Sequence, residues 1–337
     1  MTTVLITGGA GYIGSHATKY FLEKGDRVVV FDNLSRGYKQ VVKLLQNFGD
    51  LTFVKGDLVN PQEIRGVFDR FRISSVLHFA ALCSVNESME KPELYFKNNV
   101  CGTLNLLEAI RLSRGKGGLP NLVFSSTCAT YGETQYVPVD EKHPQNPTSP
   151  YGESKYIVEK MIKWYSQLHQ LNAVILRYFN VCGADPGGVI GDSKKPSALL
   201  VQNAVRGALG IEPFKITCPK VDTPDGTPIR DYVDVMDLIE AHHLAVEYLE
   251  KGGASNVFNI GTGKGNSVLE VVKTVERVLE AAIDVSGGET RKGEYAQIYA
   301  SFEKAKNILD WEPKRQLEDS VLSLKKWYDK NPQGFDY

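Results

Sequence analysis

A glycine-rich turn between a strand and a helix near the start of the chain restricts the fold more than any other feature. Residues 4–7 are a short apolar run, as in strands that are buried on both faces of a parallel sheet. Gly8, Gly11 and Gly14 follow, spaced three residues apart, and helix-compatible residues run from Ser15 to about residue 24. Glycine permits positive φ and lets backbone amides approach a pyrophosphate at the start of a helix. The order of strand, glycine turn and helix therefore predicts a dinucleotide-binding unit.

The second strand of this unit ends in an acidic residue. Residues 27–31 form the expected strand, and Asp32 follows it. A carboxylate about 20 residues beyond the glycines can hydrogen-bond an adenosine ribose and repel a 2′-phosphate. A glycine motif alone is compatible with an ordinary turn, but its strand, helix and acidic residue together favour a nucleotide site. The sequence predicts NAD as the cofactor, in preference to NADP.

Composition and charge exclude several other classes of function. The 337 residues exceed one average domain, so one large domain or two fused domains are expected. The 39 basic and 40 acidic residues nearly balance, which gives no electrostatic reason to expect nucleic acid or a membrane surface as a partner. No apolar stretch approaches the ~20 residues that span a bilayer.

The cysteines and the first residues indicate the compartment. The five cysteines are widely spaced and include no C-x-x-C pair, which is typical of a reducing compartment and predicts neither disulfides nor a metal site. The chain starts directly with a strand, which leaves no room for a signal peptide. These features predict a cytoplasmic protein.

Strand and helix patterns alternate through the first half of the chain. This alternation predicts an α/β Rossmann fold with a doubly wound parallel sheet. An apolar stripe in the helix expected over residues 94–112 should lie in the core, and consists of Val100, Leu104, Leu107 and Ile110. The expected helices cover residues 39–48, 61–71, 94–112 and 151–169, and the expected strands cover residues 51–56, 75–79, 122–124 and 174–176.

The alternation stops after residue 180. Residues 181–231 are rich in Gly, Pro and Asp, with one helical segment near 199–206. We expect a smaller α/β substrate-binding region to begin here, with helices at 267–281 and 302–309. Residues 256–260 are predicted to return to the sheet as a strand. The predicted division is an NAD-binding Rossmann domain over 1–180 and a mainly substrate-binding region over 181–337.

Three side chains near strand ends are candidates for catalysis, namely Thr127, Tyr151 and Lys155. Tyr151 and Lys155 are four residues apart, which puts them on one face of a helix. Free tyrosine has a pKa near ~10 and is a poor base, but a lysine cation and an oxidised nicotinamide favour the phenolate. Tyr151 could then take a proton from a substrate hydroxyl while hydride leaves the adjacent carbon, and Thr127 could hydrogen-bond the same hydroxyl. A tyrosine–lysine pair alone is also typical of an amphipathic surface, and only its position after the nucleotide motif favours catalysis.

Several longer stretches carry a family resemblance from about residue 3 to the end of the chain. They include TGGAGYIGSH, FSSTCATYG, SPYGESK, LRYFNVCGADP and DGTPIRDYVDVMDL. Together they resemble the UDP-glucose 4-epimerase family of the extended short-chain dehydrogenase/reductase superfamily. The resemblance implies tightly held NAD that is reduced and reoxidised in each turnover, with Tyr151 as the base. It also implies a homodimer formed through the helices near 94–112 and 151–169.

The resemblance implies two sets of contacts. For the cofactor it implies Gly8, Gly11, Tyr12, Ile13, Gly14, Asp32, Asn33, Leu34, Ser35, Arg36, Gly37, Asp57, Leu58, Phe79, Ala80, Ala81, Cys83, Asn98, Thr127, Tyr151, Lys155, Tyr178 and Phe179. For the UDP-sugar it implies Thr127, Tyr151, Asn180, Ala198, Leu199, Lys215, Ile216, Thr217, Arg230, Tyr232, Arg291, Glu294 and Ile298. The two arginines would bind the diphosphate, because guanidinium groups contact phosphate oxygens in pairs.

Some positions depart from the family pattern. Cys83 replaces a lysine that well-known members carry near the cofactor, and Ala198 replaces an asparagine that contacts the substrate. Ile298 aligns with the gate of the sugar pocket, although the uneven loop before it leaves Tyr299 as an alternative. In the family a tyrosine at the gate excludes N-acetylated sugars and a small residue admits them. Isoleucine is intermediate, so UDP-galactose, its N-acetyl analogue and the UDP-pentoses (xylose or arabinose) all stay open as substrates.

Three other functions share parts of this pattern. A sugar-nucleotide 4,6-dehydratase carries an Asp-Glu pair after the threonine, whereas Cys128 and Ala129 follow Thr127 here. A net oxidoreductase that uses free NAD is compatible with the fold alone. A nucleotide-sensing protein with a dead site is disfavoured, because the three catalytic candidates are all present.

Overall fold

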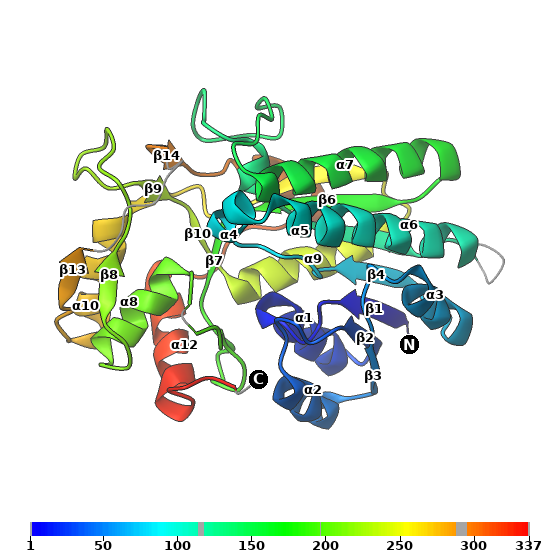
Figure 1. Ribbon diagram of the computed structural model, residues 1–337, viewed down its shortest axis with the longest axis horizontal. Helices are drawn as coiled ribbons and strands as arrows, with labels where there is room; N and C mark the ends of the chain where they lie inside the picture. Colours follow the sequence, from blue (N-terminus) through cyan, green and yellow to red (C-terminus); the bar gives the residue numbers. More distant parts are fainter. Residues whose placement is uncertain (1, 114–117, 196, 288–294, 336–337) are drawn as a thin grey trace.

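The computed structural model describes residues 2–113, 118–195, 197–287 and 295–335 (Figure 1). Its larger region is built on a parallel sheet of seven strands. Its strands are β1 (Thr3–Thr7), β2 (Arg27–Asp32), β3 (Leu51–Lys55), β4 (Ser75–His78), β5 (Asn121–Thr127), β6 (Ala173–Tyr178) and β11 (Asn256–Ile260). The order is β11-β6-β5-β4-β1-β2-β3, so the direction of winding reverses between β1 and β4. Ligands bind at the carboxyl ends of the strands beside such a reversal. The predicted Rossmann fold is confirmed.

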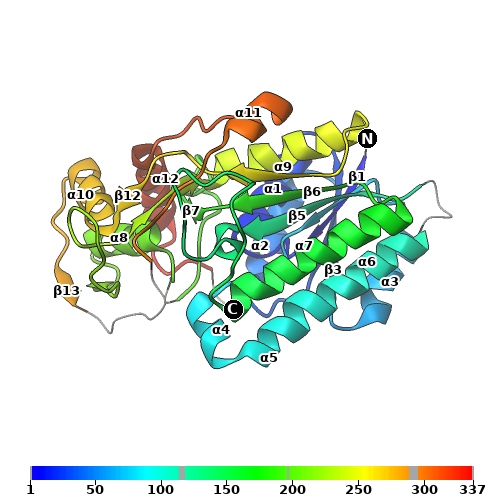
Figure 2. The same cartoon turned by 90° about the horizontal axis from the view of Figure 1, so that it is seen from above.

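Helices cover both faces of this sheet (Figure 2). Successive residues of a strand point to opposite faces, and in β1 Val4 and Ile6 join one core cluster while Leu5 joins the other. The first face is covered by α1 (Tyr12–Glu23), α2 (Lys39–Leu45), α9 (Val235–Glu250) and α11 (Glu303–Leu309). The second face is covered by α3 (Pro61–Arg70), α6 (Gly102–Leu112) and α7 (Pro150–His169).

A smaller region lies beside the carboxyl ends of the strands, on the left in Figure 1. Three helices pack around a separate apolar core that includes Val271, Trp327 and Tyr328. These helices are α8 (Leu200–Ala208), α10 (Val268–Leu279) and α12 (Leu317–Lys330). Short pairings surround them, formed by β7 (Asn180–Cys182) with β10 (Tyr232–Asp234), β8 (Phe214–Ile216) with β13 (Val285–Gly287), and β9 (Ile229–Arg230) with β12 (Asn266–Ser267) and β14 (Gln297–Ile298).

The helix expected over residues 94–112 is present, but it is not α-helical throughout. It is divided into α5 (Pro92–Tyr95), a π-helical turn at Phe96–Cys101, and α6. Within the turn, the Asn99 amide accepts from the Leu82 backbone N–H at 2.9 Å and donates to the Leu82 carbonyl at 3.0 Å. These bonds tie the turn to the segment after β4, and π turns often occur at functional sites. The predicted core stripe is also partly wrong, because Leu104 is 42% exposed.

Alternation of elements does not predict α4 (Val85–Glu90), α9 or α12. α9 packs against α1, β5 and β6, so the chain returns to the sheet through a helix as well as through β11. The Asp234 carboxylate caps α9 by accepting from the Met236 amide at 2.8 Å. The buried apolar residues of α9 recur at helical spacing, as at Val235, Leu238, Ala245 and Leu249. Sequence reasoning missed this stripe.

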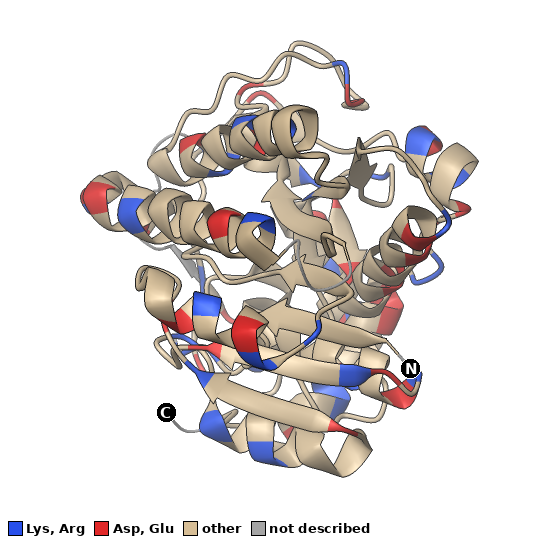
Figure 3. Ribbon diagram, turned by 90° about the vertical axis from the view of Figure 1, so that its right-hand side faces the viewer, with Lys and Arg blue, Asp and Glu red and all other residues tan. Residues whose placement is uncertain are grey.

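Two surface properties bear on possible partners. Acidic and basic residues are interspersed along the helices seen from the right-hand side of the molecule (Figure 3). In the part of the chain that the structure describes, no helix has both the length and the apolar character needed to cross a bilayer.

Candidate active site

A cleft with a volume of about 880 Å³ lies between the carboxyl ends of the sheet strands and the smaller region. Its volume is in the range of small-molecule sites. The sheet side is lined by the predicted residues Gly8, Gly11, Tyr12, Ile13, Gly14, Asp32, Asn33, Ser35, Arg36, Gly37, Asp57, Leu58, Phe79, Ala80, Ala81, Cys83, Asn98, Thr127, Tyr151, Lys155, Tyr178 and Phe179. The other side is lined by the predicted residues Asn180, Ala198, Leu199, Lys215, Ile216, Thr217, Arg230, Tyr232 and Ile298.

Three predicted site residues are not in this lining. Leu34 packs its side chain against the core and contributes a backbone amide to the turn after β2. Arg291 and Glu294 lie outside the described residues.

The glycine turn leaves a space beside the backbone that can hold the pyrophosphate of a dinucleotide. Larger side chains at these positions would fill that space. Gly8 has φ +74°, and a Cβ there would lie 2.6 Å from the Ala80 amide nitrogen. A Cβ at Gly14 would lie 2.1 Å from the Gly8 carbonyl oxygen. α1 begins at Tyr12, directly beside these glycines, and the first amides of a helix lack intrahelical partners. This cradle fits the pyrophosphate of NAD, which favours the positive end of a helix.

The Asp32 carboxylate is fixed at the end of β2. Its oxygens accept from the Ala10 amide at 3.0 Å and from the Leu34 amide at 2.8 Å. Burial raises the pKa of Asp32, while these two hydrogen bonds oppose the rise. Asn33 Nδ2 donates to Asp57 Oδ2 at 3.0 Å, which ties the segments after β2 and β3 together. The residues predicted to hold the adenosine side thus form one connected loop structure.

A close approach of two backbones brings Thr127 and Tyr151 together. Thr127 ends β5, and Tyr151 lies in the first turn of α7. The Ser149 hydroxyl caps α7 by accepting from the Gly152 amide at 3.1 Å. A Cβ at Gly152 would lie 2.5 Å from the carbonyl oxygen of Ala129. Only glycine therefore lets the start of α7 lie this close to the segment that follows Thr127.

Burial controls the protonation of the tyrosine and the lysine. It raises the pKa of Tyr151 well above its usual value near 10, and a hydrogen bond with Thr127 opposes this rise. Burial also lowers the pKa of Lys155 to about 8. Lys155 Nζ donates to the Ser125 carbonyl at 2.8 Å and lies 4.8 Å from the centre of the Phe124 ring. The lysine is on the same helix face as Tyr151, as predicted, but its ammonium is bonded to β5.

A buried polar network fixes α7 to the sheet one turn beyond Lys155. The Glu159 carboxylate accepts from Arg177 Nη2 at 2.6 Å and from the Ser126 hydroxyl at 2.5 Å. Arg177 Nη1 donates to the Tyr131 hydroxyl at 3.0 Å, and Tyr131 donates to Asn259 Oδ1 at 2.6 Å. Sequence reasoning missed this network, because its members come from distant segments and form no local motif.

On the opposite wall, Arg230 is held by the chain that carries Ile298. Arg230 Nη2 donates to the Tyr295 carbonyl at 2.9 Å, and its guanidinium carbon lies 5.0 Å from the centre of the Tyr295 ring. The neighbouring Asp231 carboxylate is buried and accepts from amides of Thr262, Gly263 and Ala300. These bonds fix β9 beside β14.

Ile298 is the better gate candidate of the two residues considered. It is buried beside Phe179 and Tyr131 and lines the cleft. Tyr299, the alternative, is not part of the lining and lies against Gly265.

We expect Gly152→Ala to lower kcat and to destabilise the protein by about 1–3 kcal/mol, the usual cost of overpacking. The added methyl group must push α7 away from Ala129 and move Tyr151 from Thr127. Urea denaturation measures the free energy of unfolding, and steady-state kinetics measure kcat. Gly66→Ala is the matched control, because a Cβ in the middle of α3 meets no atom within 4 Å. That control should be neutral or stabilising by up to ~1 kcal/mol, and an equal loss in both variants would contradict the account.

Comparison with known proteins agrees with this geometry. Residues 4–261 match the NAD dependent epimerase/dehydratase family, and this stretch includes the glycine turn, Asp32, Thr127, Tyr151 and Lys155. The chain belongs to this family. Several relatives of this chain are epimerases of UDP-sugars by name.

Two such relatives and one solved structure show how similar this chain is to known UDP-sugar epimerases. UDP-glucose 4-epimerase of Halalkalibacterium halodurans is 42% identical over 98% of this chain and 97% of its own length. Probable UDP-arabinose 4-epimerase 1 of Oryza sativa is 39% identical over 99% of this chain and 81% of its own length. A crystal structure of UDP-glucose 4-epimerase from Bifidobacterium longum with NAD+ and UDP superposes with a TM-score of 0.93 at 34% identity, covering 99% of this chain and 100% of that chain.

Proposed function

We propose that this chain catalyses the reversible, NAD-dependent C4 epimerisation of a UDP-sugar, with UDP-galactose and UDP-glucose as the principal pair. One observation carries the proposal. Thr127, Tyr151 and Lys155 line the middle of a cleft that has a dinucleotide cradle on one side and Arg230 on the other. The relatives named above, one of them solved with NAD+ and UDP, support the same ligands for this chain.

The side chains divide the reaction between them. Tyr151 removes the proton from the 4-hydroxyl of the sugar, and Thr127 hydrogen-bonds the same oxygen. Bound NAD supplies the hydride acceptor and donor at C4, a chemistry that protein side chains lack. Arg230 holds the diphosphate, so the 4-keto sugar turns about this link and presents its opposite face. Tyr151 then returns the proton to the 4-oxygen.

Lys155 and the cofactor's positive charge are what make Tyr151 a base. Burial alone raises the pKa of Tyr151 and keeps it protonated. Positive charge beside the phenol acts in the opposite direction. Proton removal therefore depends on both cations. The phenolate of Tyr151 is favoured only when oxidised cofactor is bound.

Dehydration is disfavoured by the residues after Thr127. Elimination of water needs an acid and a base at that position, and burial raises the pKa of the Cys128 thiol to about 12. A thiol with this pKa stays protonated near neutral pH. Ala129 has no proton to transfer.

The deciding experiment measures epimer formation by the purified protein, without added NAD, from an equal mixture of UDP-galactose and UDP-N-acetylgalactosamine. We expect UDP-galactose to be converted faster, because Ile298 is buried among Phe179 and Tyr131 and restricts the pocket. Ile298→Ala should shift the ratio of kcat/KM toward the N-acetylated substrate by at least about tenfold, the usual effect of a few methylenes in a pocket. If neither substrate reacts, UDP-xylose is tested next. Failure of all three with NAD bound would refute the proposal.

We also propose a cytoplasmic homodimer. In support of the compartment, all five cysteines are free thiols. In support of the dimer, several apolar side chains on α4 to α7 are exposed to solvent and not packed in the protein core. They include Met89 (58% exposed), Leu104 (42%), Leu112 (50%), Trp164 (60%) and Leu168 (67%).

Leu104→Glu is expected to convert the dimer to a monomer, because a carboxylate among these apolar side chains must be desolvated on association. Light scattering after size-exclusion chromatography measures the mass directly. Leu322→Glu is the matched control, since Leu322 is 51% exposed on α12, away from α6 and α7. A monomeric wild-type protein, or equal dissociation in both variants, would contradict the dimer.

A further inference from the structure

Two segments that are distant in the sequence meet across the cleft on its dinucleotide side. Cys83 follows β4, and Lys194 lies in the loop between β7 and α8. Lys194 Nζ donates to Cys83 Sγ at 3.7 Å, and both residues line the cleft. Neither the sequence motifs nor the family resemblance gives Lys194 a role.

The contact leaves the ammonium group with a weak partner. A thiol sulfur is a poor hydrogen-bond acceptor compared with a carboxylate or phosphate oxygen. In the described part of the chain, no carboxylate oxygen forms an ion pair with Lys194 Nζ, although the charge of Asp192 attracts it from a distance. One Asp192 oxygen instead accepts from the Ser197 hydroxyl at 2.6 Å, and the other accepts from the Lys194 backbone amide at 3.4 Å. The lysine can therefore exchange its thiol contact for an anionic ligand at little cost.

A second basic residue, Arg36, lies near Lys194 in the cleft. Arg36 lies in the predicted cofactor loop after β2, lines the cleft, and interacts repulsively with Lys194. The Glu87 carboxylate pairs with Arg36 at 2.8 Å, and it also accepts from the Tyr95 hydroxyl at 3.0 Å. The interaction with Cys83 nevertheless raises the pKa of Lys194, so the lysine stays charged at neutral pH. Arg36 is already paired with Glu87, so Lys194 supplies most of the positive charge that attracts an anion to this part of the cleft.

The loop that carries Lys194 is anchored in the smaller region. The Asp192 carbonyl accepts from Trp327 Nε1 at 3.2 Å and from the Tyr328 hydroxyl at 3.4 Å. Asn203 Nδ2 donates to the Ser197 carbonyl at 2.7 Å. These bonds tie the loop to α12 and α8, so the reach of Lys194 toward the sheet is set by the smaller region.

We infer that Lys194 is a cofactor-binding residue: its ammonium leaves the Cys83 thiol and binds a phosphate oxygen of the NAD pyrophosphate. The inference rests on the proposed function and deepens it, because it makes the smaller region a holder of cofactor as well as of substrate. The pyrophosphate then lies between the amide end of α1 and a cation from the opposite wall. The cofactor thereby joins the two regions of the molecule.

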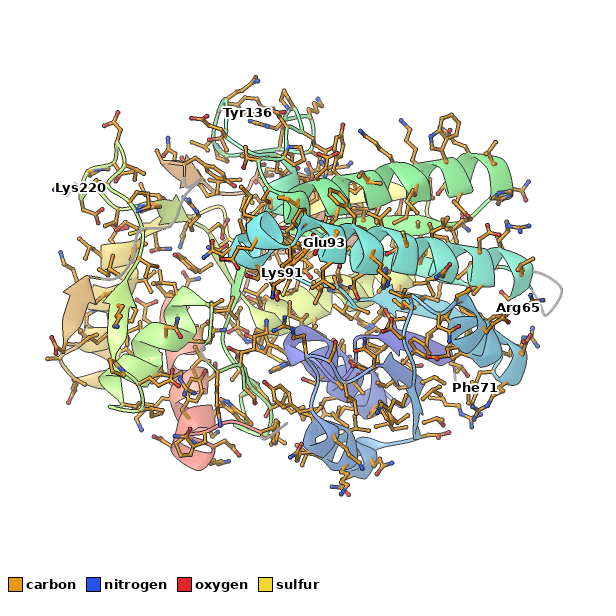
Figure 4. All side chains as sticks on the ribbon, in the orientation of Figure 1. Arg65, Phe71, Lys91, Glu93, Tyr136 and Lys220 are labelled. Carbon is orange, nitrogen blue, oxygen red and sulfur yellow. The ribbon has the colours of Figure 1, made fainter. Side chains whose placement is uncertain are left out.

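The test compares NAD+ affinity in full-length protein from which bound cofactor has been removed, by calorimetric titration. Lys194→Gln should weaken NAD+ binding by about 10- to 100-fold, the usual value of one charge-assisted hydrogen bond. Lys220→Gln is the control, because Lys220 is an exposed lysine on the outer loop after β8 (Figure 4). Its NAD+ affinity should stay within about twofold of wild type. UDP is titrated in parallel, to test whether Lys194 instead binds the diphosphate of the UDP-sugar.

A rescue variant separates binding from folding. In the Lys194→Gln background, Cys83→Lys puts an ammonium back at the same contact from the sheet side, and should recover at least tenfold in NAD+ affinity. Equal NAD+ affinity in wild type and Lys194→Gln would overturn the inference, as would a selective loss of UDP binding or the absence of rescue. Wild-type protein that binds UDP but no NAD+ would instead refute the proposed function, and the inference with it.

Discussion

Tyr151→Phe is expected to lower kcat for epimerisation by at least about 100-fold, the usual loss when a general acid–base group is removed. The substitution deletes one oxygen from a buried ring and keeps the packing against Tyr95, whose ring centre is 6.4 Å away. The hydrogen bond with Thr127 is lost with that oxygen. NAD should stay bound, because the cradle of Gly8 and Gly14 is untouched. Initial rates with UDP-galactose and the NAD content of the purified variant measure both effects.

Tyr156→Phe is the matched control for this prediction. Tyr156 is on the same helix, only partly buried, and its ring is covered by the Lys160 ammonium at 3.8 Å. Its hydroxyl is not part of the cleft lining, so activity should be close to wild type. Near wild-type turnover in Tyr151→Phe would rule out the assignment of the base.

Arg177→Met is expected to lower the free energy of unfolding by about 3–5 kcal/mol, because it leaves the Glu159 carboxylate buried without its cation. The two side chains are each only 6% exposed and are joined at 2.6 Å. The variant should also lose activity, because Glu159 bonds Ser126, the residue before Thr127. Urea denaturation gives the stability, and circular dichroism before denaturation checks that the fold persists.

Two controls test the physical cause. Arg111→Met removes a similar ion pair on α6, but Arg111 and Glu108 are 37% and 39% exposed, so the cost should stay below about 1 kcal/mol. The double variant Glu159→Gln/Arg177→Met removes both charges and should be more stable than Arg177→Met by at least about 1 kcal/mol. If the double variant is the less stable of the two, the buried charge is not the cause.

The sheet could be predicted because its signals are local. Each strand contains a short apolar run, several strands end in a polar residue, as at Asp32 and Thr127, and all seven strand positions were predicted. The π turn at Phe96–Cys101 could not be predicted, since it depends on bonds between Asn99 and the distant backbone of Leu82. α9 was missed although its buried residues, such as Leu238, Ala245 and Leu249, recur at the spacing of an amphipathic helix.

The site contacts also divide into local ones, which could be predicted, and long-range ones, which could not. Tyr151 and Lys155 are four residues apart on one helix, so their common face follows from helix geometry alone. The bonds of Lys155 to Ser125, of Glu159 to Arg177 and of Lys194 to Cys83 join separate segments of the chain. No spacing rule connects such pairs, because only tertiary folding determines which segments become neighbours.

The late return of β11 to the sheet has a consequence for synthesis on the ribosome. β11 pairs with β6, but the chain must first be translated from Tyr178 to Asn256, through the whole of α8 and α9. At common elongation rates this takes roughly 4–15 seconds. During that time the apolar strand AVILRY has an open edge, and such edges readily pair with other chains. The edge of β6 is therefore open to pairing with other chains while the sheet is still one strand short, and faster translation of this segment shortens the exposure.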